Sequence, residues 1–302
     1  MKKALVIGGS GFAGRHLIDG LLKEGCEVYA IEHKAQIPGN LNVRVIKGGI
    51  SAVDSHLIRS IQPDYIFHYA RPKLPYLRKA GRLMAARYAS WQNKRLIREL
   101  ENPGHQSKLI FASGSLMYGS SPSPLDEDSP IHPVSFASQY HRGEIPILNA
   151  EKSGKIPVMV MRFPWLLGRG SWFEWFYLRT MEKSSTVPLF GNGDNKMEVL
   201  DIRDATKMVM RYAFENEGSG IFNLVSAKAI TQLEFASAIS SVSGMPVRDY
   251  REVFHGHLEK EALQAFSSNI VLATKYPHLQ KDQHYTPLEE TLAGILSEYG
   301  LH

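Results

Sequence analysis

The feature that most constrains the fold is a glycine-rich turn between an apolar run and an amphipathic stretch near the start of the chain. The apolar run is Ala4–Ile7, and the amphipathic stretch continues to Glu24. In this setting one glycine permits a tight turn, a later one lets the backbone approach a pyrophosphate, and the last allows close packing of helix on strand. We therefore predict a dinucleotide-binding cradle made by Gly8, Ser10, Gly11, Phe12, Ala13 and Gly14.

A carboxylate stands where the adenosine ribose of a dinucleotide would be bound. The next apolar run, Val28–Ile31, leads directly to Glu32. A carboxylate at this place accepts hydrogen bonds from the ribose hydroxyls, which favours NAD over NADP. His33 and Lys34 follow immediately and would suit a 2′-phosphate instead. We predict NAD as the cofactor, with NADP as the alternative.

Short apolar runs alternate with longer amphipathic stretches in the first half of the chain. The runs are Ala4–Ile7, Val28–Ile31, Val43–Ile46, Tyr65–His68, Leu109–Phe111 and Val158–Met161, with helical patterns such as Ala13–Glu24 and Leu83–Leu100 between them. Runs without strict polar alternation are typical of strands covered on both faces. The sequence therefore predicts an α/β fold with a doubly wound parallel sheet of the Rossmann type.

This alternation becomes irregular after about residue 165, where aromatic and glycine-rich segments are interspersed. We expect a dinucleotide-binding domain over residues 1–165. A smaller C-terminal α+β lobe over residues 166–302 would bind the substrate, with some sheet strands returning to the first domain.

The net charge of +5 is unevenly distributed along the chain. Between Asp64 and Glu99 there is no acidic residue, while the basic residues there are Arg71, Lys73, Arg78, Lys79, Arg82, Arg87, Lys94, Arg95 and Arg98. This block is either a solvated helix face or a surface that attracts an anion, such as a phosphorylated substrate, an acidic carrier protein or RNA. Nucleic acid is the weakest of these partners, because the regular basic and aromatic interleaving of an RNA surface is missing.

Other features narrow the location and exclude some chemistry. Cys26 is the single cysteine, which excludes an intrachain disulfide and a multi-cysteine metal site. The closest histidines, His255 and His257, lack a suitably placed carboxylate, so we expect no catalytic metal. No apolar stretch is long enough to span a bilayer, and glycines interrupt the N-terminal apolar run. We expect a cytoplasmic protein with no membrane partner.

Together with this loop, further motifs resemble the extended short-chain dehydrogenase/reductase family, also called the NAD-dependent epimerase/dehydratase family. The matching segments are Gly8–Gly14, Pro63–Ala70, Phe111–Gly119, Met161–Arg162, Pro164–Trp165, Pro188–Gly193, Asp201–Ala205 and Gly220–Leu224. The resemblance implies cofactor contacts from residues at the ends of the fourth and sixth strands. These are Tyr69, Ala70, Arg71, Phe163 and Pro164.

The catalytic residues of that family are altered here. The family uses a tyrosine, a lysine four residues later, and a serine or threonine that polarises the substrate oxygen. Tyr140 is followed four residues later by Glu144. If Gly143-Glu144 is instead aligned with a family Gly-Glu pair, the tyrosine falls on Phe136 and the lysine on Tyr140. Pro146 further predicts a kink or a restart in the helix that follows.

The serine position of the family is altered as well. It falls on Gly114, with Ser113 and Ser115 on either side. One hypothesis is a rearranged active site in which Tyr140 exchanges a proton and Ser113 or Ser115 hydrogen-bonds the substrate. Arg71 would then favour a nearby phenolate as the missing lysine would, or else pair with an acidic residue or a cofactor phosphate.

Two classes of function follow from these departures. The first is an NAD(P)-dependent oxidoreductase or epimerase/dehydratase that acts on an alcohol or carbonyl compound of small-molecule, including secondary, metabolism. The alternative is a catalytically inactive sensor or scaffold that binds the dinucleotide without turnover.

The substrate is less constrained by the sequence. Relatives that act on nucleotide sugars often carry a diphosphate-binding arginine just before the segment Asp201–Asp204, and here that position is Met197, beside Lys196. The aromatic segment Ser171–Tyr177 is either core, a subunit contact, or the wall of an apolar pocket. We predict a small-molecule substrate, anionic or carrier-bound, and candidate contacts from Tyr118, Trp165, Trp172 and Lys196.

The resemblance also implies a homodimer. In the family, the helices corresponding to Leu83–Leu100 and to the stretch after Tyr140 often form a dimer interface. A basic helix facing its symmetry mate would repel itself unless acidic residues of the next helix interleave.

Overall fold

The computed structural model describes residues 1–37, 39, 42–72, 78–101, 106–216, 218–253 and 259–301, with side chains of the third helix described from residue 81. The chain forms two compact units whose segments alternate along the sequence. The first unit contains Met1–Ser113, Ser138–Arg162 and Thr206–Phe222, and the second contains Gly114–Ala137, Phe163–Ala205 and Asn223–His302. The domain boundary at residue 165 stays a prediction.

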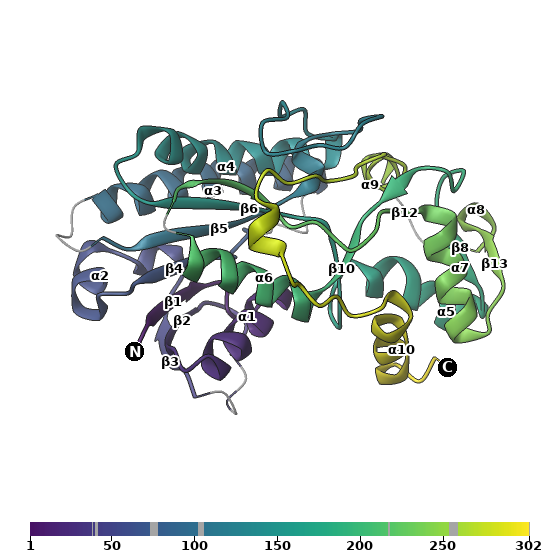
Figure 1. Cartoon of the computed structure of the whole chain (residues 1–302), viewed down its shortest axis with the longest axis horizontal. Coiled ribbons are helices and arrows are strands. Elements are labelled where there is room, and N and C mark those ends of the chain that lie inside the picture. Colours follow the sequence, from purple (N-terminus) through teal and green to yellow (C-terminus); the bar gives the residue numbers. More distant parts are fainter. Residues whose placement is uncertain are drawn as a thin grey trace. The chain divides into compact units, whose positions relative to one another are not determined.

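A seven-stranded sheet forms the centre of the first unit (Figure 1). Its strands, in spatial order, are β11 (Gly220–Asn223), β6 (Val158–Phe163), β5 (Lys108–Gly114), β4 (Tyr65–His68), β1 (Lys3–Ile7), β2 (Glu27–Glu32) and β3 (Arg44–Lys47). The pairs β1–β2, β2–β3, β1–β4 and β4–β5 are parallel. The predicted doubly wound sheet of the Rossmann type is confirmed.

Helices cover both faces of this sheet (Figure 1). They are α1 (Phe12–Lys23), α2 (Ser55–Ile61), α3 (Arg78–Glu101), α4 (Ser135–Ser153) and α6 (Ile202–Glu215). The α3 and α4 helices lie on one face, and α1 and α6 on the other. Apolar side chains such as Leu96 and Ile147 from the helices and Leu5, Ile66 and Val160 from the sheet form its core.

The strand order reverses between β1 and β4, and the chain packs unusually closely at that point. A side-chain carbon at Gly8, which follows β1, would lie 2.6 Å from the Ala70 backbone nitrogen, and Gly8 has a φ of 95°. A carbon at Gly14 would lie 2.2 Å from the Gly8 carbonyl oxygen. Backbone packing therefore requires glycine at both positions. In open parallel sheets, such a reversal of strand order is where ligands bind.

The α4 helix corrects one expectation from the sequence. It is continuous from Ser135 to Ser153 and contains Pro146, so the predicted restart was wrong. Proline removes one backbone N–H, which leaves the carbonyl four residues earlier without its helical partner. That residue, Arg142, is exposed, so its carbonyl can be hydrated and the helix can continue.

The second unit is a mixed α+β region, as predicted. Its strands form three small sheets: β7 (Trp165–Leu167) with β10 (Val199–Asp201), β9 (Lys196–Met197) with β12 (Ile230–Thr231), and β8 (Val187–Leu189) with β13 (Val247–Asp249). Its helical segments are η3 (Ser115–Met117), η4 (Glu174–Leu178), α5 (Arg179–Ser184), α7 (Gln232–Ser243), α8 (Tyr250–Val253), α9 (Lys260–Phe266), η5 (Pro277–Gln280) and α10 (Leu288–Glu298).

Aromatic side chains dominate the core of the second unit. Phe173, Tyr177, Phe190 and Phe235 are fully buried there. The aromatic segment Ser171–Tyr177 thus supplies core residues. Its Phe173 and Tyr177 rings stack on each other, and both contact the Phe235 ring edge to face. Across the described residues of the chain, no helix has the length and apolar character that crossing a membrane requires.

Candidate functional site

The glycine loop places the start of α1 so that it can hold an anion. Gly11 is the residue before the helix, and it has no side chain that could cap the first turn. The first turn of α1 contains no acidic residue. The free N–H groups and the positive end of the helix dipole therefore favour a phosphate at this position.

Gly8, Gly11 and Gly14 of this loop are glycine for different reasons. Gly8 and Gly14 are required by neighbouring backbone, as described above. A side-chain carbon at Gly11 would meet only the Gly8 carbonyl oxygen, at 3.3 Å, among the described residues. Its φ of −76° is open to any residue. Folding therefore gives a weaker reason for glycine at position 11 than at positions 8 and 14, and the close approach of a pyrophosphate gives a further one.

The remaining members of the predicted cradle lie beside these glycines. Ser10, Phe12 and Ala13 are half-buried, and the Phe12 ring contacts His16 on the next turn of α1. Tyr69 and Ala70 follow β4 at the packed reversal of strand order. These placements are compatible with cofactor contacts, which stay predictions.

Glu32 is a fixed, buried carboxylate at the end of β2. One of its oxygens, Oε2, accepts the Ile37 backbone N–H at 2.8 Å. The other, Oε1, forms an ion pair with the Nζ atom of Lys47 on the neighbouring strand. The pKa of Glu32 lies below its usual value, mainly because of the contact with Lys47 and, to a smaller extent, because of the hydrogen bond from the Ile37 N–H. The side chain is thus a charged acceptor, as ribose recognition requires.

Two of the predicted catalytic residues contact each other in the first unit. The guanidinium carbon of Arg71 lies 4.3 Å from the centroid of the Tyr140 ring. Arg71 comes from the segment after β4, and Tyr140 from α4. This is a cation–π contact, in which the guanidinium lies over the ring face.

Ser113 faces the interior instead of being free to meet a substrate. Its hydroxyl donates a hydrogen bond to Oε2 of Glu144 at 2.8 Å and accepts one from Nη1 of Arg162. Arg162 and Glu144 form an ion pair at 2.5 Å and are 0% and 1% exposed. Sequence reasoning missed this cluster. The signal for it was an arginine inside the otherwise apolar strand β6.

A second buried network joins three elements of the first unit. Nε2 of His68 is 2.8 Å from Oδ1 of Asn93, and Nδ2 of Asn93 donates to the Gly143 carbonyl oxygen at 2.8 Å. The network therefore links β4, α3 and α4. Burial lowers the pKa of His68 to about 4, so the imidazole is neutral at physiological pH.

The predicted residues Ser115 and Tyr118 belong to the second unit, where both are buried. The Tyr118 hydroxyl donates to Oδ1 of Asn223 at 2.7 Å. Asn223 in turn donates to the carbonyl oxygens of Leu125 and Ala273. Tyr118 is therefore part of an internal hydrogen-bond network. For the Ser115 side chain, the described part of the chain records no hydrogen-bond partner.

The other candidates in the second unit surround its aromatic core. Trp165 stacks on Phe266, with centroids 5.1 Å apart, and contacts Trp172 edge to face at 4.8 Å. Lys196 is exposed, and Met197 beside it is buried in the core. Phe163, the last residue of β6, and Pro164, which follows it, are both buried.

Two buried carboxylates of the second unit were not found from the sequence. Glu198 accepts hydrogen bonds from the backbone and hydroxyl of Ser226 and from the Leu272 backbone, at 2.8–3.1 Å. Burial raises the pKa of Glu198 to about 7. Glu127 accepts the Asn223 and Lys275 backbone N–H groups, both at 2.9 Å or less. These contacts satisfy buried backbone N–H groups and give both residues a structural role.

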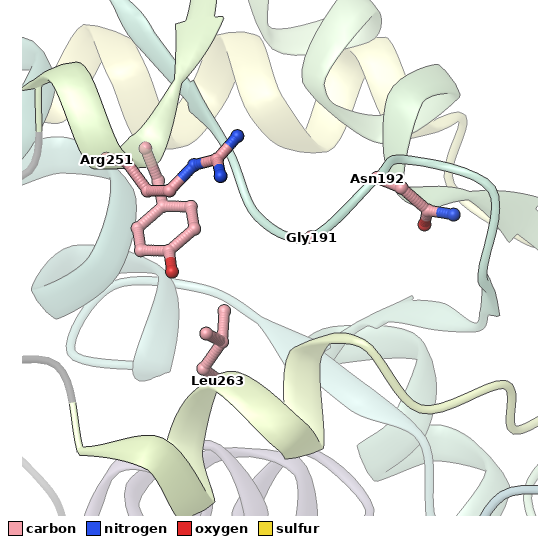
Figure 2. Close-up of a pocket in the computed structure, with 5 residues that line it drawn as sticks. Gly191, Asn192, Arg251 and Leu263 are labelled. Atoms are coloured by element: carbon pink, nitrogen blue, oxygen red, sulfur yellow. The ribbon is translucent and has the colours of Figure 1, made fainter.

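A small surface hollow also lies in the second unit (Figure 2). It is lined by Gly191, Asn192, Tyr250, Arg251 and Leu263 and has a volume of about 290 Å³. The Arg251 guanidinium is paired with Asp249, with Nε to Oδ1 at 2.9 Å, so its charge is already balanced. The hollow is therefore small for a ligand site and offers no unbalanced charge.

Metal ligation receives no support from the described residues. They contain no group of three or more His, Cys, Asp or Glu side chains arranged to hold a metal ion. His255 and His257 lie outside the described residues, as does Lys73 of the basic block.

Comparison with known proteins identifies related sequences. The family model described as "NAD dependent epimerase/dehydratase family" matches residues 4–224. The chain is 24% identical to the UDP-glucose 4-epimerase of Lactobacillus helveticus over 280 residues, covering 81% of this chain and 83% of that protein. It is also 24% identical to the uncharacterized protein y4nG of Sinorhizobium fredii over 266 residues. That alignment covers 82% of this chain and spans 64% of the relative's length.

Solved structures share the fold at low sequence identity. The UDP-glucose 4-epimerase of Thermotoga maritima with UDP-glucose has a TM-score of 0.78 at 19% identity, covering 99% of this chain and 98% of that one. MoeE5 in complex with UDP-glucuronic acid and NAD has a TM-score of 0.76 at 20% identity, covering 99% of both chains.

The buried state of His68 predicts a pH-dependent free energy of unfolding. The native imidazole stays neutral down to about pH 4, while in the unfolded chain it protonates near pH 6.5. The unfolded state therefore binds more protons between these values, and stability falls as the pH falls. We expect His68 to account for a loss of about 2 kcal/mol between pH 7 and pH 5.

Urea unfolding of the wild type and of His68→Gln at both pH values measures this loss. The variant should show a smaller decrease in stability than the wild type, and His33→Gln, at an exposed histidine, should behave as the wild type does. Equal decreases in the wild type and His68→Gln would contradict the prediction.

Proposed function

Because the chain belongs to the NAD dependent epimerase/dehydratase family, we propose that it binds NAD and acts as an oxidoreductase, epimerase or dehydratase on a small alcohol or carbonyl substrate. The observation that carries the proposal is Gly11. A side-chain carbon in its place would meet one atom of the described protein, the Gly8 carbonyl oxygen at 3.3 Å, a tight contact that a shift of a few tenths of an ångström relieves. A pyrophosphate bound at the helix N-terminus gives a stronger reason for glycine at this position.

The residues of the first unit fit the cofactor in charge and hydrogen bonding. The loop from Gly8 to Gly14 offers backbone donors to the diphosphate, and Glu32 offers a charged acceptor to the adenosine ribose. When bound, NAD would supply the hydride acceptor for the reaction. The protein's part is to orient the substrate and to hold or move a proton.

Tyr140 is the proposed proton-transferring group. Its ring contacts Arg71, whose guanidinium lies over the ring face and holds the side chain in place. Arg71 is a positioning residue in this proposal, because it acts through Tyr140.

Ser115 is a better candidate than Ser113 for hydrogen-bonding a substrate oxygen. A serine hydroxyl has one proton to donate, and Ser113 donates it to Glu144. Ser115 has no such internal partner among the described residues. We therefore propose that Ser113 positions the strand end and that Ser115 contacts the substrate.

The substrate class follows from the relatives. MoeE5 and the Thermotoga epimerase were solved with UDP-sugars, which are anionic small molecules. We propose a nucleotide sugar or a similarly anionic substrate for this chain. Lys196, which is exposed beside the core residue Met197, is the cation that we propose for the diphosphate.

A second candidate function is dinucleotide binding without turnover. It is favoured by Phe136, which has no hydroxyl where one alignment places the family tyrosine, and by Tyr140 at the lysine position. The Ser113–Glu144–Arg162 cluster also removes one serine hydroxyl from the chemistry. Both candidates require the cofactor, so turnover distinguishes them.

Exchanging Gly11 for alanine tests the cofactor site. A methyl group there needs only a small adjustment inside the protein but stands in the way of the pyrophosphate. We expect Gly11→Ala to fold with a thermal midpoint close to that of the wild type and to bind NAD at least about tenfold more weakly by calorimetry.

Gly14→Ala is the contrasting variant. Its methyl group would collide with the Gly8 carbonyl oxygen, so we expect a loss of stability of roughly 1–3 kcal/mol or more. Unchanged NAD affinity in a folded Gly11→Ala protein would contradict the proposed site.

Turnover with a UDP-sugar tests the role of Tyr140. The probes are UDP-glucose and UDP-glucuronic acid with NAD, followed by NADH absorbance and by chromatography of the sugar product. If the wild type turns either over, Tyr140→Phe should lower kcat by about a hundredfold or more, since proton transfer is lost. Phe136→Leu is the control and should retain activity. A Tyr140→Phe protein as active as the wild type would rule out this role, and an inactive wild type that binds NAD would favour the second candidate.

The exposed face of α3 supports the predicted homodimer. Met84, Tyr88 and Trp91 follow one another at helical spacing and are 54%, 51% and 58% exposed. Such a row of large apolar side chains is typical of an interaction surface. Arg87 and Lys94 lie beside it and are exposed, so two copies of this face would also repel each other.

We therefore expect a dimer that tightens as salt rises, because salt screens the repulsion. Light scattering at low and high salt should give twice the chain mass of 33.9 kDa, most completely at high salt. Trp91→Glu should give the monomer mass, while Trp175→Glu, at an equally exposed tryptophan of the second unit, should not. A wild-type protein that is monomeric at every salt concentration would contradict the dimer.

A further inference from the structure

The ends of β1, β2 and β3 place three functional groups along one edge of the sheet. These strands are parallel neighbours, so their carboxyl ends meet at the same edge. Gly8 follows β1, Glu32 ends β2 and Lys47 ends β3, and the strand register pairs Glu32 directly with Lys47. The edge therefore carries a phosphate cradle, then a carboxylate, then an ammonium group.

The carboxylate and the ammonium differ sharply in exposure. The side chain of Glu32 is 7% exposed, whereas that of Lys47 is 76% exposed. Glu32 is held in place by two contacts, Ile37 N–H on Oε2 and Lys47 on Oε1. A carboxylate has about four lone-pair positions, so both oxygens keep acceptor capacity for a ribose diol. Lys47 has three donors, of which Glu32 takes one.

These groups have opposite effects on the two nicotinamide dinucleotides. An uncompensated carboxylate repels the 2′-phosphate of NADP and excludes that cofactor. Because Lys47 is paired with Glu32, the net charge of these two side chains together is close to zero. The ammonium has donors left for a phosphate, and the exposed side chains of His33 and Lys34 are the next groups along the chain.

We infer that Lys47 is a residue that determines cofactor specificity, because it offsets the charge of Glu32 and admits NADP to the same site as NAD. This inference rests on the proposed dinucleotide site and extends it to a residue outside the glycine loop. Lys47 acts on the 2′-phosphate and does not take part in the chemical step.

Calorimetric titration of the full chain with NAD and with NADP, at one fixed salt concentration, tests the inference. The wild type should bind the two cofactors with dissociation constants within about tenfold of each other. Lys47→Gln should weaken NADP by about tenfold or more and leave NAD within about threefold. Glu32→Gln should shift the preference in the opposite direction, towards NADP.

Arg44→Gln is the matched control. Arg44 lies three residues earlier on the same strand and also pairs with a glutamate, Glu27. This variant should leave both affinities unchanged, and the thermal midpoints of all the variants show whether they are folded.

Three results would overturn the inference. The first is a wild type that binds NAD and excludes NADP, the second is a Lys47→Gln variant with an unchanged ratio of the two dissociation constants, and the third is an equal loss of both affinities. The third result would mean that Lys47 only holds Glu32 in place. Each of these leaves NAD binding intact in the wild type. A wild type that binds neither cofactor would instead overturn the proposed function itself.

Discussion

The internal ion pair between Arg162 and Glu144 is the interaction on which the first unit depends most. It joins the end of β6 to α4, and Ser113 at the end of β5 bridges its two members. A buried pair of this kind contributes little net stability, but the loss of one partner costs about 3–5 kcal/mol, because the other charge is left in the interior. The pair therefore fixes how α4 packs on the sheet, and α4 carries Tyr140.

The sheet was predictable from the sequence because its strands are short apolar runs that alternate with amphipathic helical patterns. The predicted strand Tyr65–His68 coincides with β4, and Leu109–Phe111 lies within β5. Elements whose form depends on distant contacts were not predictable in the same way. Pro146 suggested a break in α4 that the helix does not have. The role of Ser113 depends on residues 31 and 49 positions away in the chain, which no local pattern reveals.

The second unit illustrates a different limit. Its loops have backbone N–H groups that no regular sheet or helix satisfies, and the carboxylates of Glu198 and Glu127 accept those of Ser226 and Lys275. An isolated glutamate in a sequence is most often a surface residue, so neither was recognised beforehand. For the aromatic segment Ser171–Tyr177 the sequence left three interpretations open, namely core, subunit contact or pocket wall, and burial of Phe173 and Tyr177 places those two rings in the core.

The hydrogen-bonded chain from His68 through Asn93 to Gly143 has a mechanical consequence. Its middle member lies on α3, so a shift of α4 along the sheet would break bonds between groups that cannot reach water. The end of β4 and the part of α4 around Gly143 are thereby held as one rigid body. Arg71 and Tyr140 stand on those two segments, three residues from His68 and from Gly143 respectively. The arginine–tyrosine pair is therefore preorganised by the scaffold beneath it, with little dependence on whatever binds above it.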